Sequence, residues 1–466
     1  MAIQIDSSLT PAALLPQIEK LFTLSGQKIN ALQKRWNAAD GTPVFTVAGK
    51  YGSRGWTEWT QGFQFGSALL QFDATGDASF LEMGRKATVD FMAPHVSHTG
   101  VHDHGFNNVS TYGNLLRLLN EGRIPANATE KDFYVLALKI SGAVQASRWT
   151  KIGPDAGYIY SFNGPHSLFA DTIRSLRSLA VSYLLGHKFM AEGDKPVDLL
   201  ARLLQHAETT AKFAVYYGKG RDSYDVPALR GRTAHESIFN TNDGQYRCPN
   251  SQQGYCPFTT WTRGLAWILA GYPEEIEFLE TLSDEELKPY GGKAAILARF
   301  REVAESVADF YLSQTPTCGV PYWDTGAPGL VHLGDYLNRP AEPFNAHEPV
   351  DSSAAAIAAQ GLYRLGLHLQ KIGNTAQQEK GLRYEKAALT VTKTLFAAPY
   401  LSEDPAHEGL LLHSVYHRPN GWDYVPAGQQ VPCGESSMWG DYHARELALL
   451  LFRQAKGQPY YTFFSK

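Results

Sequence analysis

Two aspartates lie in short motifs whose residue types could carry out acid–base chemistry. Asp103 belongs to the run HDHGF at residues 102–106, and Asp171 belongs to FADT at residues 169–172, near the start of an apolar-periodic segment. Either aspartate alone is more often a helix cap than a catalyst. The stretches around them are punctuated by Gly and rich in Trp, Tyr, His and Arg. A sugar-binding cleft needs this mixture of aromatic faces, polar edges and proton-transferring carboxyls.

The composition excludes several classes of protein. The chain has 466 residues, a formal net charge of −4 and no long basic run, so neither nucleic acid nor an anionic membrane surface is an expected partner. Hydrophobic residues at 44% allow a large core. There is no apolar stretch of about 18 residues and no signal-like start. We expect a cytoplasmic monomer or homodimer, or a periplasmic protein if a signal segment was removed.

The cysteines do not form a CxxC pair. They are Cys248, Cys256, Cys318 and Cys433. In a chain this long we expect reduced thiols in a reducing compartment. A bridge between Cys248 and Cys256 across a short loop is the alternative.

The elements that must position the two aspartates are helices. Apolar residues recur at spacings of three and four in about twelve segments. The segments are 11–37, 58–74, 79–94, 109–121, 129–150, 166–187, 195–217, 259–271, 292–314, 350–370, 376–396 and 436–454. Twelve helices paired as hairpins can close into an all-α toroid, the (α/α)6 barrel, with small-residue or aromatic helices inside. We expect one catalytic domain over residues 1–466.

Two long stretches break the helical pattern, at residues 218–258 and 400–435. Loops of this length within a compact domain are usually functional. We expect them to form short strands or turns over the mouth of the barrel.

Several motifs, taken in chain order, resemble one enzyme family. They are EWTQGF (58–63), HDHGF (102–106), the helix opened by Asp171, His235 with QGY (253–255), WTRGLAW (261–267), PYWD (321–324), DSSAA (351–355), LLHSVY (411–416) and GESSMWGDY (434–442). The set resembles the unsaturated glucuronyl hydrolases of glycoside hydrolase family 88 from about Trp59 to about Asp441. WTRGLAW and DSSAA are also similar to the unsaturated rhamnogalacturonyl hydrolases of family 105, whereas HDHGF with a second aspartate favours family 88.

The resemblance implies an (α/α)6 barrel and an unusual glycosidase reaction. The enzymes of the family remove a 4,5-unsaturated uronic acid from the non-reducing end of oligosaccharides that polysaccharide lyases have produced. They do so by hydrating the double bond, so the carboxyl-separation rules for retention and inversion do not apply. Asp171 matches the general acid and base, and a pKa raised by an apolar pocket or by Asp103 would help it. Asp103 matches the second essential carboxylate.

The same resemblance implies a set of substrate-binding residues. Gln253 and Arg263 match positions that contact the uronate carboxylate, for which the arginine fork is well suited. His235 matches a histidine on the substrate side, and His102 is expected in the same site. Trp59 and Trp267 match the aromatic walls of the cleft. Three positions depart from the usual motifs, namely His104, Leu265 and the pair Phe258-Thr259, and these departures leave the substrate rather than the reaction open.

Other interpretations stay open at this stage. The pairs His102/His104 and His413/His417 suggest a metal site, but zinc needs three or four converging ligands, so we expect no metal and no cofactor. Among other (α/α)6 proteins, an epimerase would use two histidines, with His235 and His413 as the pair to nominate. An inverting glycosidase on saturated glycans would need a partner such as Glu435. A non-catalytic sugar-binding protein would need neither aspartate.

Overall fold

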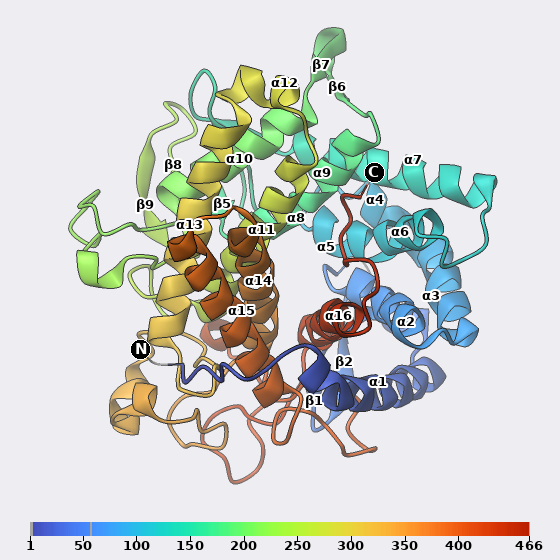
Figure 1. Ribbon diagram of the computed structural model, residues 1–466, viewed down its shortest axis with the longest axis vertical. Coiled ribbons are helices and arrows are strands. Elements are labelled where there is room, and N and C mark those ends of the chain that lie inside the picture. Colours follow the sequence, from blue (N-terminus) through green and yellow to red (C-terminus); the bar gives the residue numbers. More distant parts are fainter. Residues whose placement is uncertain (1–2, 56–57, 466) are drawn as a thin grey trace.

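Helices alternate between an inner and an outer ring in the computed structural model, which describes residues 3–55 and 58–465. The inner ring comprises α2 (Gln61–Thr75), α5 (His104–Asn108) with α6 (Asn114–Asn120), α8 (Thr172–Ser175) with α9 (Arg177–Leu184), α11 (Thr262–Glu280), α14 (Ser352–Lys371) and α16 (Met438–Ala455). The outer ring comprises α1 (Leu15–Arg35), α3 (Ala78–Phe91), α7 (Ala128–Ser147), α10 (Leu199–Phe213), α13 (Lys293–Gln314) and α15 (Thr375–Leu395). Figure 1 labels these helices, and their alternation confirms the predicted all-α (α/α)6 barrel.

The inner helices are buried on almost every side, and small residues let them approach each other. The alanine run of α14, Ala354–Ala356, is fully buried. A Cβ placed on Gly361 of α14 would lie 2.1 Å from the carbonyl oxygen of Leu269 in α11. Only glycine permits this backbone contact between the two inner helices.

Each of the twelve predicted segments contains a helix, but some boundaries differ. The segment predicted at 109–121 begins at His104 and passes through a π-helical turn, Val109–Gly113. The segment predicted at 166–187 starts as a strand, and its helix begins only at Thr172. Helix α11 continues through Pro273 to Glu280, because its buried surface outweighs the hydrogen bond that proline removes. Two further short helices are α4 (Ala93–Val96) and α12 (Asp284–Leu287), and Ser283 and Glu286 form a capping box at the start of α12.

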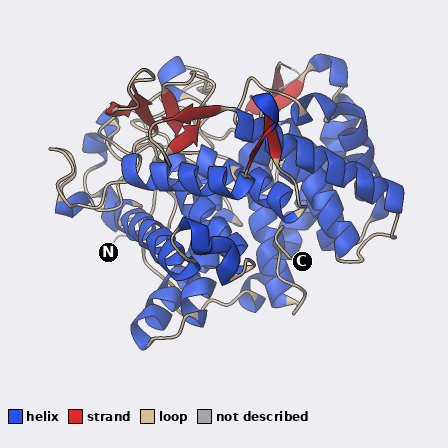
Figure 2. Cartoon of the chain, turned by 90° about the horizontal axis from the view of Figure 1, so that it is seen from above, coloured by secondary structure: helices blue, strands red, loops and turns tan. Residues whose placement is uncertain are grey.

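Short antiparallel strands gather at one end of the barrel, as Figure 2 shows. The pairs are β1 (Thr42–Val47) with β2 (Lys50–Arg54), β3 (Trp149–Lys151) with β4 (Gly157–Ile159), β6 (Phe189–Ala191) with β7 (Lys195–Val197), and the three-stranded set β5 (Ser167–Phe169), β8 (Glu236–Phe239) and β9 (Tyr246–Asn250). The 218–258 stretch supplies β8 and β9, as expected. The hairpin β1–β2 was not predicted.

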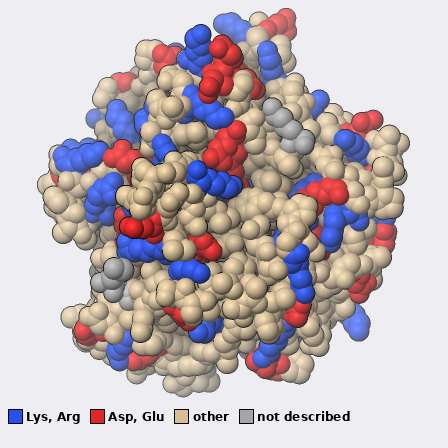
Figure 3. Space-filling model, in the orientation of Figure 1, with Lys and Arg blue, Asp and Glu red and all other residues tan. Residues whose placement is uncertain are grey.

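The C-terminal segment crosses the other end of the barrel, where Figure 1 shows it in front of the inner helices. Within it Tyr461 is fully buried and Phe464 is 2% exposed, so the segment seals that end. On the face drawn in Figure 3, acidic and basic side chains are interspersed. No helix among the described residues is long and apolar enough to cross a membrane. All four cysteines are free, and the expectation of one domain stays a prediction.

Candidate active site

A cavity of about 400 Å³ opens at the end of the barrel where the inner helices begin. Its lining includes all the predicted site residues except His235, namely Trp59, His102, Asp103, Asp171, Gln253, Arg263 and Trp267. Each of these residues lies just before an inner helix, in its first turns, or in the 218–258 loop. Helix N-termini carry partial positive charge and free N–H groups, so this end of the barrel favours an anionic ligand.

The two aspartates face each other across His102. The Nε2 atom of His102 lies 3.7 Å from Oδ1 of Asp103 and 3.6 Å from Oδ2 of Asp171. Both aspartates stand at the N-cap position of a helix, α5 and α8 respectively, but neither side chain makes a capping hydrogen bond. The Oδ1 atom of Asp171 is buried without a hydrogen-bond partner among the described residues. The helix-cap interpretation therefore does not account for either carboxylate.

The glycine of the HDHGF motif brings the two aspartate-bearing helices together. A Cβ on Gly105 would lie 2.2 Å from the carbonyl oxygen of Ser175. The backbone N–H of Gly105 donates to the Ser175 hydroxyl at 2.9 Å, and that hydroxyl donates to the carbonyl of His102 at 2.6 Å. The amide of Gln145 donates to the same carbonyl at 2.9 Å. These contacts fix the backbone of His102 relative to α8, and with it the distance between the carboxylates.

Burial and mutual charge give the three groups different proton affinities. Burial raises the pKa of Asp103, and the charge of Asp171 adds to this in spite of His102. Burial also acts to raise the pKa of Asp171, but the hydrogen bond and charge of His102 lower it, and the net pKa is lowered. Burial lowers the pKa of His102, but the two carboxylates outweigh it and the net pKa is raised. The expectation of a raised pKa at Asp171 is therefore wrong, because His102 lies between the two carboxylates.

His235 lies beside the cavity rather than on its wall. Its Nδ1 accepts the backbone N–H groups of Gln252 and Gln253, at 3.0 and 3.3 Å. Its ring packs against Phe169 and Trp261, with centroids 4.5 and 4.7 Å away. Burial lowers the pKa of His235 to about 4, so the ring is neutral and its Nε2 carries the proton. That Nε2 is buried without a partner among the described residues, which leaves a hydrogen-bond donor free.

Arg263 is held by several protein acceptors. Its Nη1 pairs with Oδ2 of Asp351 at 3.1 Å and donates to the carbonyl of Val415. Its Nη2 donates to Oε1 of Gln253 and to the carbonyl of Tyr416, both at 2.9 Å. Both ends of the guanidinium fork are therefore engaged. Because Arg263 binds the oxygen of the Gln253 amide, the NH₂ group of Gln253 is left to donate elsewhere.

Aromatic side chains form the walls of the cavity. Trp59 stacks on Trp439 with centroids 5.0 Å apart, and Trp267 packs against Phe106 at 4.9 Å. The predicted wall position of both tryptophans agrees with this arrangement. Further lining residues were not nominated as substrate-binding residues from the sequence, namely Arg54, Gly55, Glu58, His98, Val101, Phe162, Gln252, Trp261, Tyr416, His417 and Trp422. Glu58, Trp261 and Tyr416 lie within the quoted motifs, which could have identified them, whereas Phe162 carries no sequence signal.

Other residues considered from the sequence lie away from the cavity. Glu435 accepts the N–H of Gly49 at 3.1 Å, and Nδ1 of His413 accepts the N–H of Gly434 at 3.0 Å. Neither lines the cavity, so the glycosidase pair with Glu435 and the epimerase pair with His413 lose their geometric basis. The unusual His104 also points elsewhere, since its ring contacts Ser141 and the carbonyl of His98.

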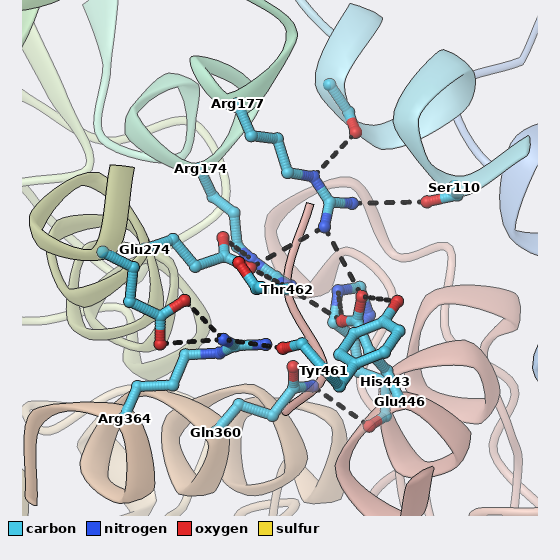
Figure 4. Close-up of polar contacts among 12 residues, drawn as sticks. Ser110, Arg174, Arg177, Glu274, Gln360, Arg364, His443, Glu446, Tyr461 and Thr462 are labelled. Atoms are coloured by element: carbon cyan, nitrogen blue, oxygen red, sulfur yellow. Dashed lines mark hydrogen bonds and ion pairs between the residues drawn. The ribbon is translucent and has the colours of Figure 1, made fainter. Parts of the chain in front are cut away.

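A buried ionic network joins the inner helices that follow the two aspartates, and Figure 4 shows its polar contacts. Arg174, one helical turn after Asp171, donates to both oxygens of Glu274 at 2.8 and 2.9 Å and to Glu446 at 2.9 Å. Arg177 donates to the carbonyl of Gly105 at 2.9 Å and lies 3.5 Å from Glu446. The network therefore ties the helices of both aspartates to α11 and α16, below the floor of the site.

The three central groups could also hold a cation. His102, Asp103 and Asp171 each offer one ligand atom, and these atoms lie within 4.8 Å of one another. Three such ligands are the minimum for a catalytic zinc site. The sequence-based expectation of no metal stays a prediction that a chelator can test.

Comparison with known proteins adds to this geometry. No family model matches the chain. The chain is 26% identical over 410 residues to an unsaturated glucuronyl hydrolase of Bacillus sp. (strain GL1), covering 87% of this chain and 89% of that protein. It is 25% identical over 396 residues to one of Formosa agariphila, covering 84% and 78%. The crystal structure of the Bacillus sp. GL1 enzyme matches with a TM-score of 0.68 at 23% identity, over 95% of this chain and 97% of that one.

The fold and these relatives define the protein as a glycoside hydrolase built on an (α/α)6 barrel. The resemblance to the unsaturated glucuronyl hydrolases of glycoside hydrolase family 88, which the motifs indicated, is confirmed.

Proposed function

We propose that the protein removes a 4,5-unsaturated uronic acid from the non-reducing end of lyase-generated oligosaccharides. The observation that carries the proposal is the cluster of His102, Asp103 and Asp171, buried in an aromatic-walled cavity with ligand atoms within 4.8 Å of one another. Proton transfer to carbon needs a positioned acid and a base in one water-limited site, and this cluster offers both. Substrate contacts by Trp59, Gln253, Arg263, His235 and Trp267 are part of the proposal.

In the proposed reaction Asp171 gives a proton to C4 of the unsaturated ring. Positive charge then develops at C5 and is shared with the ring oxygen, and a water molecule adds its oxygen to C5. The proton lost by that water returns to Asp171. The resulting hemiketal opens to a ketone at C5, and C1 releases the next sugar as an alcohol. The step adds one water molecule and needs no oxidant, nucleotide or cofactor.

The protonation states support a division of roles. Asp171 must carry a proton at the start although its pKa is lowered, so it needs a proton source close by. His102, with a raised pKa and its Nε2 at 3.6 Å from Asp171, is that source. Binding of an anionic uronate displaces water and adds negative charge, and both changes raise the pKa of Asp171. Asp103, whose pKa is raised, holds a proton or stabilises the charge that develops at C5.

The uronate carboxylate is proposed to lie at the starts of the inner helices. We assign two side-chain donors to this carboxylate, the NH₂ group of Gln253 and the free Nε2–H of His235. Arg263 supports this arrangement by holding Gln253, and a direct contact between Arg263 and the carboxylate stays a prediction. A cytoplasmic location and a monomeric or dimeric state, expected from the sequence, also stay predictions, as does the absence of nucleic-acid partners.

A panel of unsaturated oligosaccharides produced by different lyases tests the proposal through loss of the double-bond absorbance. Asp171→Asn should lower kcat by at least about 100-fold, the scale for removal of a general acid. Asp198→Asn is the matched control, because Asp198 caps α10 in the outer ring, away from the cavity. Full activity of the Asp171→Asn variant would overturn the assignment of the acid.

A further inference from the structure

Arg54 lies on the rim of the active-site cavity, on a platform of two aromatic rings. Its guanidinium carbon is 4.4 Å from the ring centroid of Trp422 and 5.4 Å from that of Tyr416. All three residues line the cavity. Arg54 is exposed, whereas Asp103 and Asp171 are buried at 7% and 8% exposure. The cavity therefore has a cationic, aromatic mouth above an acidic floor.

The β1–β2 hairpin holds Arg54 in this position. Arg54 ends β2, paired with Thr42 of β1. The turn into β1 is fitted to it, because Gly41 has φ +85° and a Cβ there would lie 2.3 Å from the carbonyl oxygen of Arg54. The ring of Phe45 in β1 stacks on Tyr416, with centroids 5.5 Å apart and planes at 21°. The hairpin and the 400–435 loop thus support each other, and the platform does not depend on Arg54 alone.

The charge of Arg54 is not neutralised by an ion pair within the described residues. The carboxylate of Asp423, which follows Trp422 in the chain, accepts the backbone N–H groups of Tyr416 and His417. Burial raises the pKa of Glu58, the other acid at the mouth, which reduces its negative charge. The second arginine of the cavity, Arg263, is paired with Asp351. Of the two arginines that line the cavity, Arg54 is therefore the one without an ion pair to a carboxylate among the described residues.

The stacking of Arg54 leaves its hydrogen-bonding edge available. A guanidinium that lies over an aromatic ring uses its face, while its N–H groups point outward in the plane. One side of the Arg54 guanidinium interacts with the Tyr416 hydroxyl, and its other N–H groups are available to a ligand. Such an edge binds carboxylate or sulfate through two parallel hydrogen bonds. The adjoining faces of Trp422 and Tyr416 suit the CH groups of a sugar ring.

We propose that Arg54, Trp422 and Tyr416 form the subsite for the sugar that follows the cleaved uronate, and that Arg54 recognises an anionic group on that sugar. A sulfate ester and a carboxylate share the required chemistry. The inference rests on the proposed function, since the floor of the cavity is assigned to the unsaturated uronate. It adds that the preferred substrates carry a second negative charge, one sugar away from the first.

The test is calorimetric binding to the Asp171→Asn variant, in which substrate is not consumed. Three unsaturated disaccharides serve as probes, with a neutral second sugar, a sulfated hexosamine or a second uronate. The two anionic probes should bind about 10-fold or more tightly than the neutral one, the scale of one hydrogen bond to a charged group. Adding Arg54→Ala should abolish that ratio and leave binding of the neutral probe within about threefold. Arg54→Lys should keep only part of the ratio, because lysine lacks the fork.

Arg247→Ala is the control, since Arg247 is 54% exposed and pairs with Asp243 away from the cavity. It should leave the ratio unchanged. Equal binding of the three probes, binding of none, or a preference that survives Arg54→Ala would overturn the inference. Comparing the affinities of the sulfated and diuronate probes shows whether Arg54 prefers a sulfate ester or a carboxylate. Turnover of the neutral probe by the unsubstituted protein tests the proposed function separately, so the two failures are distinguishable.

Discussion

Replacing Arg174 by methionine should destabilise the protein strongly, because the change removes the centre of the ionic network beneath the active site. Arg174 is fully buried and makes three hydrogen bonds to carboxylates, at 2.8, 2.9 and 2.9 Å. After the change Arg177 still lies 3.8 Å from Glu274 and 3.5 Å from Glu446, and the Tyr461 hydroxyl still donates to Glu446 at 3.2 Å. Methionine fills much of the volume, so the effect reports lost charge pairing rather than a cavity.

The expected loss is about 3–5 kcal/mol in the free energy of unfolding, the range for breaking a buried ion pair by removing one partner. The loss should depend on pH. Arg174 lowers the pKa of both Glu274 and Glu446, against the effect of burial. A lowered carboxylate pKa adds stability above the ordinary value of about 4.3, and that stability fades as pH falls. The difference between the two proteins should therefore be full near pH 7 and shrink below about pH 4.

Urea denaturation followed by far-ultraviolet circular dichroism measures the difference. Arg247→Met is the control, because its exposed pair with Asp243 should contribute less than about 1 kcal/mol. A loss below about 1 kcal/mol for Arg174→Met, or a loss that does not diminish at low pH, would refute the reasoning about the network.

Three further predictions concern the site itself. Gly105→Ala should lower kcat/KM by about 10-fold or more and destabilise the fold, because its Cβ would clash with the carbonyl of Ser175. The control Gly76→Ser, at the open C-terminus of α2, should leave kcat/KM unchanged. Retained activity in Gly105→Ala would show that the two aspartate-bearing helices can separate. Dialysis against a chelator should leave activity intact, and a loss restored by a divalent cation would assign His102, Asp103 and Asp171 to a metal. If protonated His102 supplies the proton, kcat/KM should fall as pH rises through a pKa above the usual histidine value, and His102→Asn should remove that alkaline limb; an unchanged limb would exclude the role.

The barrel could be predicted from the sequence because each helix needs an apolar face and the spacing of apolar residues records it. The catalytic candidates could be identified because HDHGF and the start of α8 are local motifs. In contrast, the β1–β2 hairpin depends on pairing with the rest of the barrel end, and its place beside Tyr416 follows from contacts nearly 400 residues apart in the chain, such as that between Phe45 and Ser437.

The electrostatics of the site also depend on contacts between distant segments. The lowered pKa of Asp171 results from the placement of His102 between two carboxylates, which two motifs 68 residues apart do not reveal. The partners of Arg263 come from Asp351, Val415 and Tyr416, on two other segments. The resemblance therefore indicated that the Arg263 fork binds the uronate carboxylate, and only the fold shows that protein acceptors already engage this fork.

The central claim is that the enzyme acts on the double bond rather than on the anomeric carbon. A matched pair of disaccharides, identical except for the C4–C5 double bond, tests it most directly through kcat/KM for release of the second sugar. The account predicts release from the unsaturated disaccharide, with loss of the double bond, and no measurable release from the saturated one. Comparable release from the saturated disaccharide would contradict it, because direct hydrolysis at C1 would then suffice.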